Sequence, residues 1–427
     1  MRQTKTIRGR SPTARRTTTT PAAVWLPVRT PAPANPSSVA SSRALFPYPA
    51  LFWLPLLLCF VGLVFQFSVC IGDILKPGSP PTSPFSAFRV VIMQSLWLVI
   101  GLGVMSLIAR VPVRFWQATA GLWLVLGIVS VLILFIPGVG KTINYATRWL
   151  AVPLPGLGQM LIQPSEAYKL ITVFWFAWLY STQKRVWSLW AVLGTLLWLL
   201  GVIAIERQPD LGTGLLIMGV GVGIAFLGGA RIGRLSLFLG GGALLVALVL
   251  FLPVIKGAIK GEPWEQQRNA YRLQRVIAMM DPWAHQQDVG YQMVRAQLAV
   301  GSGGFARLGI GEGREKRYLP AAENDYIFAT IAEETGFVGS VMVIGLVALV
   351  VYHCFRLACQ TPSRFGRLVV LGMALWIGLS ALINIGMAIG VLPTVGLPLP
   401  FVSAGGSALL SLMAGLGVVQ AVARERR

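Results

Sequence analysis

The stretch YLPAAENDYIF at residues 318–328 places two carboxylates directly before a long apolar run. Such side chains are scarce, because the 427 residues include only 15 Asp and Glu. These acids lie at the mouth of a predicted membrane helix, where a carboxylate can act on groups at the membrane surface. Asp325 is therefore a candidate functional residue. Its alternative role is to cap the following helix, since Asn324-Asp325 is suitable capping chemistry.

Two more acids, Glu333 and Glu334, lie within the apolar run itself. Glu334 is nine residues past Asp325, which is about 13 Å along a helix. Charges at that depth are expensive unless they are paired. We therefore expect an Arg or Lys from another outer loop to be the partner of these acids.

Residues 147–169, TRWLAVPLPGLGQMLIQPSEAYK, predict a charged pair at the start of another helix. Pro164 suits the first turn of that helix. Glu166 and Lys169 are three residues apart and would share one helix face. Lys169 would lie about one turn inside a membrane span, where a charge indicates function. The alternative is a structural Glu–Lys pair. Arg148 belongs to the same stretch.

Two further stretches offer groups that bind anions. Asp210, in the predicted turn ERQPDLGTG at 206–214, either belongs to a functional cluster or caps the next helix. The uncharged loop LPTVGLPLPFVSAGGSALL at 392–410 leads into a helix that opens with small residues. Free amides at such a helix start bind phosphate, and close helix packing is the alternative. The residues concerned are Ser403, Gly405, Gly406 and Ser407.

The elements that must position these clusters are membrane helices. The chain is 55% hydrophobic and 12% charged, whereas soluble domains average about 25% charged residues. Several apolar runs reach the roughly 20 residues needed to cross a bilayer. The sequence therefore predicts an all-α integral membrane protein, a bundle of about ten transmembrane helices. The predicted spans are 47–71, 89–109, 115–136, 166–182, 186–205, 212–230, 235–255, 326–352, 368–391 and 404–423.

The basic residues orient this bundle. With the N-terminus inside, every short inner loop carries Arg or Lys and no acid, as the positive-inside rule requires. Both termini are therefore predicted to be cytoplasmic, with one large extracytoplasmic loop between helices seven and eight. Of the acids, only Glu425 falls on the inner side. The net charge of +21 follows from these loops, and nucleic-acid binding is not indicated. The inner-loop residues are Arg110, Arg114, Lys184, Arg185, Arg231, Arg234, Arg356, Arg364 and Arg367.

The chain divides into two parts. Residues 1–43 contain eight basic residues and no acid, and they are predicted to be a disordered cytoplasmic tail. Residues 44–427 form the membrane domain, which includes the large outer loop 256–325. A run of glycine and serine at 301–304 allows close backbone approach to an anion, although such runs are often only flexible turns. The cysteines and histidines have no zinc-site spacing, so metal ligands are unknown.

The clusters together gather carboxylates, Arg, Lys and anion-binding backbone on the outer face of one bundle. The acids are not strung along the depth of the bilayer. An anionic lipid headgroup therefore suits this arrangement better than an ion path does.

In this order the motifs resemble those of the SEDS family (shape, elongation, division and sporulation), the FtsW and RodA proteins of bacteria. The motifs that carry the resemblance are TRW…QPSEAYK, QPDLGT, DPW…GYQ…VGSGG…YLPAAENDYIFA…EETG and GLPLPFVSAGGS. They cover about residues 140–423, and DPW and GYQ favour the FtsW branch. Asn324 and Tyr326 replace Thr and Phe of the family, Ala404 replaces Tyr, and Lys316 sits one residue nearer to YLP.

The resemblance implies a peptidoglycan glycosyltransferase, a hexosyltransferase that polymerises lipid II. The reaction would take place on the outer face of the bacterial cytoplasmic (inner) membrane during cell division. Asp325 matches the family's catalytic acid and would be the general base. Arg148, Glu166 and Lys169 match positions of the family's active site. The other expected substrate-binding residues are Asp210, Lys316, Glu334, Ser403, Gly405, Gly406 and Ser407.

The family's partners are a class B penicillin-binding protein, which is a transpeptidase, and other division proteins. No cofactor is certain, but a divalent cation, Mg²⁺ or Mn²⁺, could help to neutralise the pyrophosphate of lipid II. A lipid II flippase is one alternative, although it would need a polar path through the spans. A non-enzymatic membrane scaffold of the division machinery is another, and it would tolerate the loss of Asp325.

Overall fold

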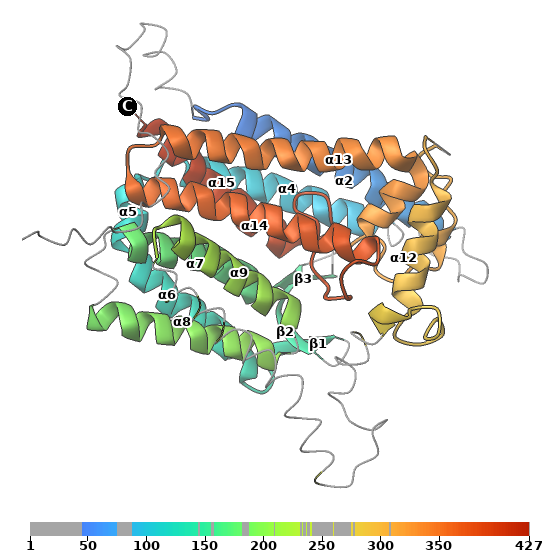
Figure 1. Cartoon of the computed structure of the whole chain (residues 1–427), viewed down its shortest axis with the longest axis horizontal. Helices are drawn as coiled ribbons and strands as arrows, with labels where there is room; N and C mark the ends of the chain where they lie inside the picture. The colour runs from blue at the N-terminus through green and yellow to red at the C-terminus, as the bar shows by residue number, and fades with distance from the viewer. Residues whose placement is uncertain are drawn as a thin grey trace, which may run out of the picture.

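The computed structural model describes a bundle of long helices with a small sheet near one end (Figure 1). The described residues are 45–74, 88–143, 146–154, 158–181, 188–208, 210–230, 278–306 and 309–426, together with 233, 236, 240, 259 and 275. The predicted tail 1–43 and most of the predicted span 235–255 lie outside them.

Nine of the ten predicted spans correspond to helices among the described residues. These are α2 (Ala50–Ile74), α4 (Arg89–Ile108), α6 (Ala120–Leu132), α7 (Pro164–Ser181), α8 (Leu189–Arg207), α9 (Leu211–Leu227), α13 (Ile327–Gln360), α14 (Arg364–Ala388) and α15 (Gly406–Arg424). Shorter helices are α5 (Val113–Ala118), α12 (Tyr291–Ser302) and the 3-10 turns Ile133–Phe135 and Glu315–Arg317. The count of ten spans stays a prediction.

Six described helices are long and apolar enough to cross a membrane, namely α2, α4, α8, α13, α14 and α15. Many large apolar side chains on the bundle are exposed, including Trp190 at 78% and Phe226 at 61%. Soluble proteins rarely expose so much contiguous apolar surface, so these side chains suit contact with lipid. The chain is a multi-pass membrane protein, as its composition predicts.

The two ends of the bundle differ in charge. At one end the first and last described segments meet, because Tyr48 N donates to Gln420 Oε1 (3.1 Å) and Arg424 donates to Leu45 O (3.3 Å). We call this the arginine-rich end, since Arg110, Arg114, Arg356, Arg364 and Arg367 flank its helix termini. The sheet and the turn before α13 lie at the opposite, sheet-bearing end (Figure 1). This matches the predicted grouping of the basic loops for these five residues, whereas Lys184, Arg185, Arg231 and Arg234 lie outside the described residues.

The sheet is a difference from the predicted all-α fold. Three antiparallel strands, β1 (Gly140–Ile143), β2 (Ala146–Leu154) and β3 (Gly158–Ile162), pair in the order β1-β2-β3. The stretch contains the β-forming residues Thr, Trp, Val and Ile, but its prolines and glycines favoured a loop prediction. The sheet matters for the site, because β2 carries Arg148 and β3 leads directly into α7.

Close packing fixes the bundle around the site. α15 lies against α4, and α14 lies against α7, α9 and α13. At the α4–α15 contact, a Cβ atom added to Gly417 would lie 2.8 Å from the backbone oxygen of Met105. Small residues allow such close helix contacts in membranes. The glycine content of α15 therefore has a packing role.

Candidate active site at the sheet-bearing end

Asp325 lies in the turn just before α13. Tyr326, not Asp325, is the N-cap residue of α13, and no side chain caps that helix. The capping alternative for Asp325 is therefore wrong. No described residue hydrogen-bonds to its half-buried carboxylate. Burial raises the pKa of Asp325 to about 6; the Asp210 carboxylate adds to this effect, while Arg275 and Arg148 oppose it. Such an acid can accept a proton near neutral pH.

The loop 392–405 holds the turn that contains Asp325. Asn384 Nδ2 donates to the backbone oxygens of Asp325 (2.8 Å) and Leu397 (2.7 Å). Ser403 Oγ donates to Asn324 O at 2.6 Å. These bonds are made to backbone oxygens of the turn, so they fix its position. They leave the Asp325 carboxylate without a hydrogen bond from the described residues.

Amide side chains inside the membrane helices support the same loop. Gln66 of α2 donates to Val402 O at 2.8 Å. Gln94 of α4 donates to Ser403 O (3.4 Å) and accepts from Gly405 N (3.2 Å). With Asn384 of α14, three helices thus contribute one amide each. The sequence analysis missed these residues, although an amide within an apolar run is a signal because it must find a partner.

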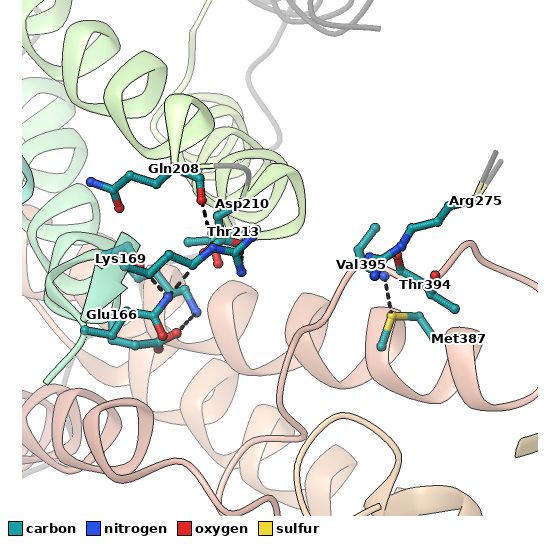
Figure 2. Close-up of polar contacts among 12 residues, drawn as sticks. Glu166, Lys169, Gln208, Asp210, Thr213, Arg275, Met387, Thr394 and Val395 are labelled. Carbon is teal, nitrogen blue, oxygen red and sulfur yellow. Dashed lines mark hydrogen bonds and ion pairs between the residues drawn. The ribbon is translucent and has the colours of Figure 1, made fainter. Parts of the chain in front are cut away.

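Asp210 links β2, α7 and α9. Its carboxylate accepts from Thr213 N at 3.4 Å and so caps α9, as one of the two predictions proposed. It also accepts from Gln163 Nε2 (3.2 Å) and lies 3.8 Å from Arg148 Nη1. Arg148 Nε donates to Gln208 O at 2.8 Å, and Figure 2 shows Asp210 between Gln208 and Thr213. The helix cap is therefore also part of a charged cluster.

Glu166 and Lys169 form the predicted pair on one face of α7. Lys169 Nζ lies 2.6 Å from Glu166 Oε1, and their side chains are only 2% and 5% exposed, respectively (Figure 2). Both line a small cavity, open to solvent, between α7, α14 and the start of α15. Trp376, Ser403 and Gly405 also line it. The structure thus brings four predicted site residues into one cavity.

The start of α15 has packing contacts. Ser407 accepts from Gln163 N (2.9 Å) and donates to Leu161 O (3.2 Å), which joins α15 to the end of β3. A Cβ atom added to Gly406 would lie 2.0 Å from Trp97 Nε1. These contacts agree with the packing alternative for both residues. Their predicted role in phosphate binding stays a prediction.

Lys316 and Glu334 form a buried ion pair of 2.5 Å, with both side chains 0% exposed. Ser68 of α2 joins them, since its Oγ lies 2.6 Å from each partner. Glu334 thus has a basic partner, as expected, but Lys316 comes from the loop that leads into α13 itself and not from another outer loop. Neither charged residue lines the cavity described above. The pair fastens residues 309–316 to α2 and α13, and its role in substrate binding stays a prediction.

The glycine run at 301–304 approaches a helix closely. A Cβ atom added to Gly303 would lie 1.9 Å from Ala332 O. Gly304 O accepts from Phe337 N at 2.9 Å, next to Gly336, whose φ of 68° interrupts α13. Close approach was predicted, but here it serves the contact between this run and α13.

Arg275 is a site residue that the sequence analysis missed. Its Nη1 donates to Thr394 O at 2.9 Å (Figure 2), and its charge lowers the pKa of Asp325 against the effect of burial. Nothing in its sequence spacing connects it to Asp325, because the two meet only in the folded chain. Arg148 and Arg275 thus place positive charge near the carboxylate.

The described side chains of this site do not form a ready set of ligands for a divalent cation. Within the described ranges, no three Asp, Glu, His or Cys residues gather as metal ligands. Glu166 is paired with Lys169, and Asp210 is committed to Thr213, Gln163 and Arg148.

The chain matches the model of a family described as cell cycle protein, FtsW/RodA/SpoVE, over residues 49–427. It is 34% identical to the probable peptidoglycan glycosyltransferase FtsW of Thioalkalivibrio sulfidiphilus over 78% of this chain and 80% of that protein. It is 33% identical to the protein of the same name from Taylorella equigenitalis, over 86% and 95%.

Solved structures are similar as well. One is a chain from a structure titled "Structural coordination of polymerization and crosslinking by a peptidoglycan synthase complex". The two chains align with a TM-score of 0.66 and 28% identity, over 88% of this chain and 97% of the other. Another is the rod shape determining protein RodA of Thermus thermophilus, with a TM-score of 0.59 and 27% identity over 88% and 96%.

Proposed function

Because the chain belongs to the FtsW/RodA/SpoVE family of cell cycle proteins, we propose that it acts as a peptidoglycan glycosyltransferase that polymerises lipid II during cell division. Its relatives carry the name FtsW. The observation that carries the proposal is Asp325: a half-buried carboxylate with a pKa of about 6, flanked by Arg148 and Arg275. We assign Asp325 as the general base.

The reaction joins an acceptor sugar hydroxyl to the anomeric carbon of a donor. Asp325 takes the hydroxyl proton as the new C–O bond forms. The bond between the anomeric carbon and the pyrophosphate oxygen breaks, and the lipid pyrophosphate leaves with that electron pair. Arg148 and Arg275 neutralise the charge that develops there. Glu166 holds Lys169 at 2.6 Å, so the ammonium group is fixed at the cavity wall.

The site faces the outside of the cytoplasmic membrane in this proposal. The arginine-rich end would then lie in the cytoplasm, in agreement with the positive-inside rule. Among the described residues, the buried charged side chains, including Glu166, Lys169 and Glu334, lie toward the sheet-bearing end. A polar path through the bilayer, as a flippase needs, is not favoured by this distribution.

The partner in this proposal is a class B penicillin-binding protein that crosslinks the new strands. The similarity to a chain of a peptidoglycan synthase complex supports this assignment. Lipid II supplies both donor and acceptor, and other division proteins recruit the pair. A divalent cation, if it takes part, would be held by the substrate pyrophosphate rather than by this chain's side chains alone.

Polymerisation of labelled lipid II by the purified full chain, together with its transpeptidase, tests the proposal. We expect Asp325→Asn to reduce glycan ladders at least a hundredfold, since general base catalysis typically contributes about 10²–10⁴. Glu323→Gln is the matched control, because Glu323 lies in the same turn and burial also raises its pKa; it should stay within about threefold. Wild-type ladders from Asp325→Asn would remove Asp325 from the role of base. No ladders from the wild type would overturn the enzymatic proposal itself.

A further inference from the structure

A second group of polar side chains lies at the arginine-rich end, about a bilayer away from Asp325. Tyr48 precedes α2, and its hydroxyl lies 3.3 Å from His353 Nδ1 of α13. Burial raises the pKa of Tyr48, while Arg356 and Arg426 both oppose this effect. The two guanidinium groups therefore lie within electrostatic range of one phenol. We call Tyr48, His353, Arg356 and Arg426 the inner cluster.

The positions along α13 bring the two arginines of the inner cluster close together. Arg356 and Gln360 are four residues apart, so they share one face of α13. Arg426 Nη1 donates to Gln360 Oε1, which places its guanidinium one turn from Arg356. Residues 353 and 356 are three apart and share the same side. The tail after α15 thus adds a second positive charge beside that of α13.

The inner cluster has no counter-ion among the described residues. Arg356 and Arg426 are exposed, and no ion pair is found for either in this part of the chain. The carboxylate of Glu425, the residue before Arg426, bonds to another segment, since its Oε1 accepts a hydrogen bond from Val113 N at 2.7 Å. Two adjacent arginines without a carboxylate form a site that favours a phosphate, because guanidinium groups bind phosphate oxygens with good geometry.

The depth of the inner cluster suits a lipid headgroup. Arg356 lies 20 residues past Gly336, the break in α13, and this corresponds to about 30 Å of helix, the thickness of the hydrocarbon core. Residues 337–355 between them carry no Lys, Arg, Asp or Glu. Tyr352 (56% exposed) contacts the His353 ring edge-on, and Trp53 (62% exposed) lies in the first turn of α2, five residues past Tyr48. Aromatic residues are common at membrane interfaces.

We propose that the inner cluster binds the phosphate of an anionic phospholipid of the inner leaflet. Arg356 and Arg426 donate to the phosphate oxygens, and Tyr48 and His353 border the headgroup. The exposed apolar face of α13 above it, which includes Leu349 and Tyr352, receives the acyl chains. This site is separate from the Asp325 site and does not depend on the glycosyltransferase reaction.

Lipid retention by the delipidated full chain tests this site. Native mass spectrometry would compare phosphatidylglycerol with phosphatidylcholine of the same acyl chains. We expect Arg356→Gln with Arg426→Gln to lower phosphatidylglycerol retention by roughly tenfold or more, since each arginine near an anionic headgroup contributes substantially. Arg110→Gln with Arg114→Gln is the control: it removes the same charge from exposed positions at the same end, and it should change retention less than about twofold. Unchanged thermal unfolding would show that both variants fold.

Three results would overturn the proposal. Equal loss of retention in both double variants would mean general surface charge instead of a site. Equal retention of the two lipids by the wild type would exclude a headgroup preference. Displacement of phosphatidylglycerol by low millimolar inorganic phosphate would assign the cluster to a free anion rather than to a lipid.

Discussion

At the scale of single residues, carboxylates near the sheet-bearing end differ in whether a cation neutralises them. Glu166 and Glu334 each face a lysine ammonium, at 2.6 and 2.5 Å. Asp325 has no such partner among the described side chains, and burial raises its pKa to about 6. A carboxylate with no cationic partner remains available to accept a proton. This contrast supports the proposed role of Asp325 as the general base.

The pKa of Asp325 predicts the pH dependence of polymerisation. A general base works only when ionised, so kcat/KM should fall as the pH is lowered through about 6 and level off above it. An ordinary aspartate, with a pKa of 3.8, would move this fall to about two units lower. Initial rates of ladder formation across roughly pH 4.5–8, with unfolding monitored in parallel, provide the measurement. A flat profile down to the lower limit would contradict this assignment.

At the scale of elements, buried amides on α2, α4 and α14 position the loop 392–405 and, through it, the turn that contains Asp325. Asn384 is the central one, because it bonds to the backbone on both sides, at Asp325 and Leu397. Each helix alone is only an apolar cylinder. The single amide of each helix donates a hydrogen bond to a carbonyl oxygen of the loop or of the adjoining turn. Without such a partner, a polar group within the membrane would lower the stability of the fold.

Asn384→Leu should therefore lower both stability and activity. The change keeps the branched shape of the side chain but leaves two buried carbonyl oxygens unsatisfied, at about 1–3 kcal/mol each. We expect a lower unfolding temperature in detergent and a reduced kcat for lipid II polymerisation. The pH at which the rate falls should move as well, because the surroundings of Asp325 change. Leu382→Ala, at a 65% exposed position of the same helix, is the control and should alter neither. If Asn384→Leu resembled that control, the amide would have no positioning role.

Elements were predictable to different degrees, for physical reasons. Long apolar runs specify membrane helices by themselves, and the spacing of Glu166 and Lys169 specifies a shared face. The β1-β2-β3 sheet could not be predicted in this way, because the prolines and glycines in and around its short strands are typical of loops. Arg275 and Asn384 could not be linked to Asp325, since their meeting depends on tertiary packing. Sequence thus predicted the groups that pair locally and missed those that converge from distant segments.

At the scale of the whole molecule, the proposal depends on which end faces outward. Cys359 is exposed near the arginine-rich end of α13, while Cys59, Cys70 and Cys354 are buried. Phe305, 75% exposed, lies in the segment that packs against the opposite end of α13. These positions allow the orientation to be measured with very few substitutions.

In intact spheroplasts, a membrane-impermeant maleimide should label Phe305→Cys in a Cys359→Ser background. It should label the native Cys359 only after permeabilisation, because the arginine-rich end is expected to be cytoplasmic. The Cys359→Ser chain without the added cysteine gives the background. Labelling of Cys359 in intact spheroplasts would invert the orientation and place Asp325 on the wrong side for an extracytoplasmic reaction.

The polar contacts of α2 bear on how the chain is assembled during synthesis. Ser68 bonds to Lys316, 248 residues later, and Gln66 bonds to Val402, 336 residues later. At about 5–20 residues per second, a ribosome needs roughly 12–50 s to travel from Ser68 to Lys316. Until these partners are synthesised, the side chains of Gln66 and Ser68 on α2 lack the hydrogen bonds to Val402 and Lys316. The turn that contains Asp325 can therefore reach its final position only after the loop 392–405 has been synthesised and has met Gln66 and Asn384.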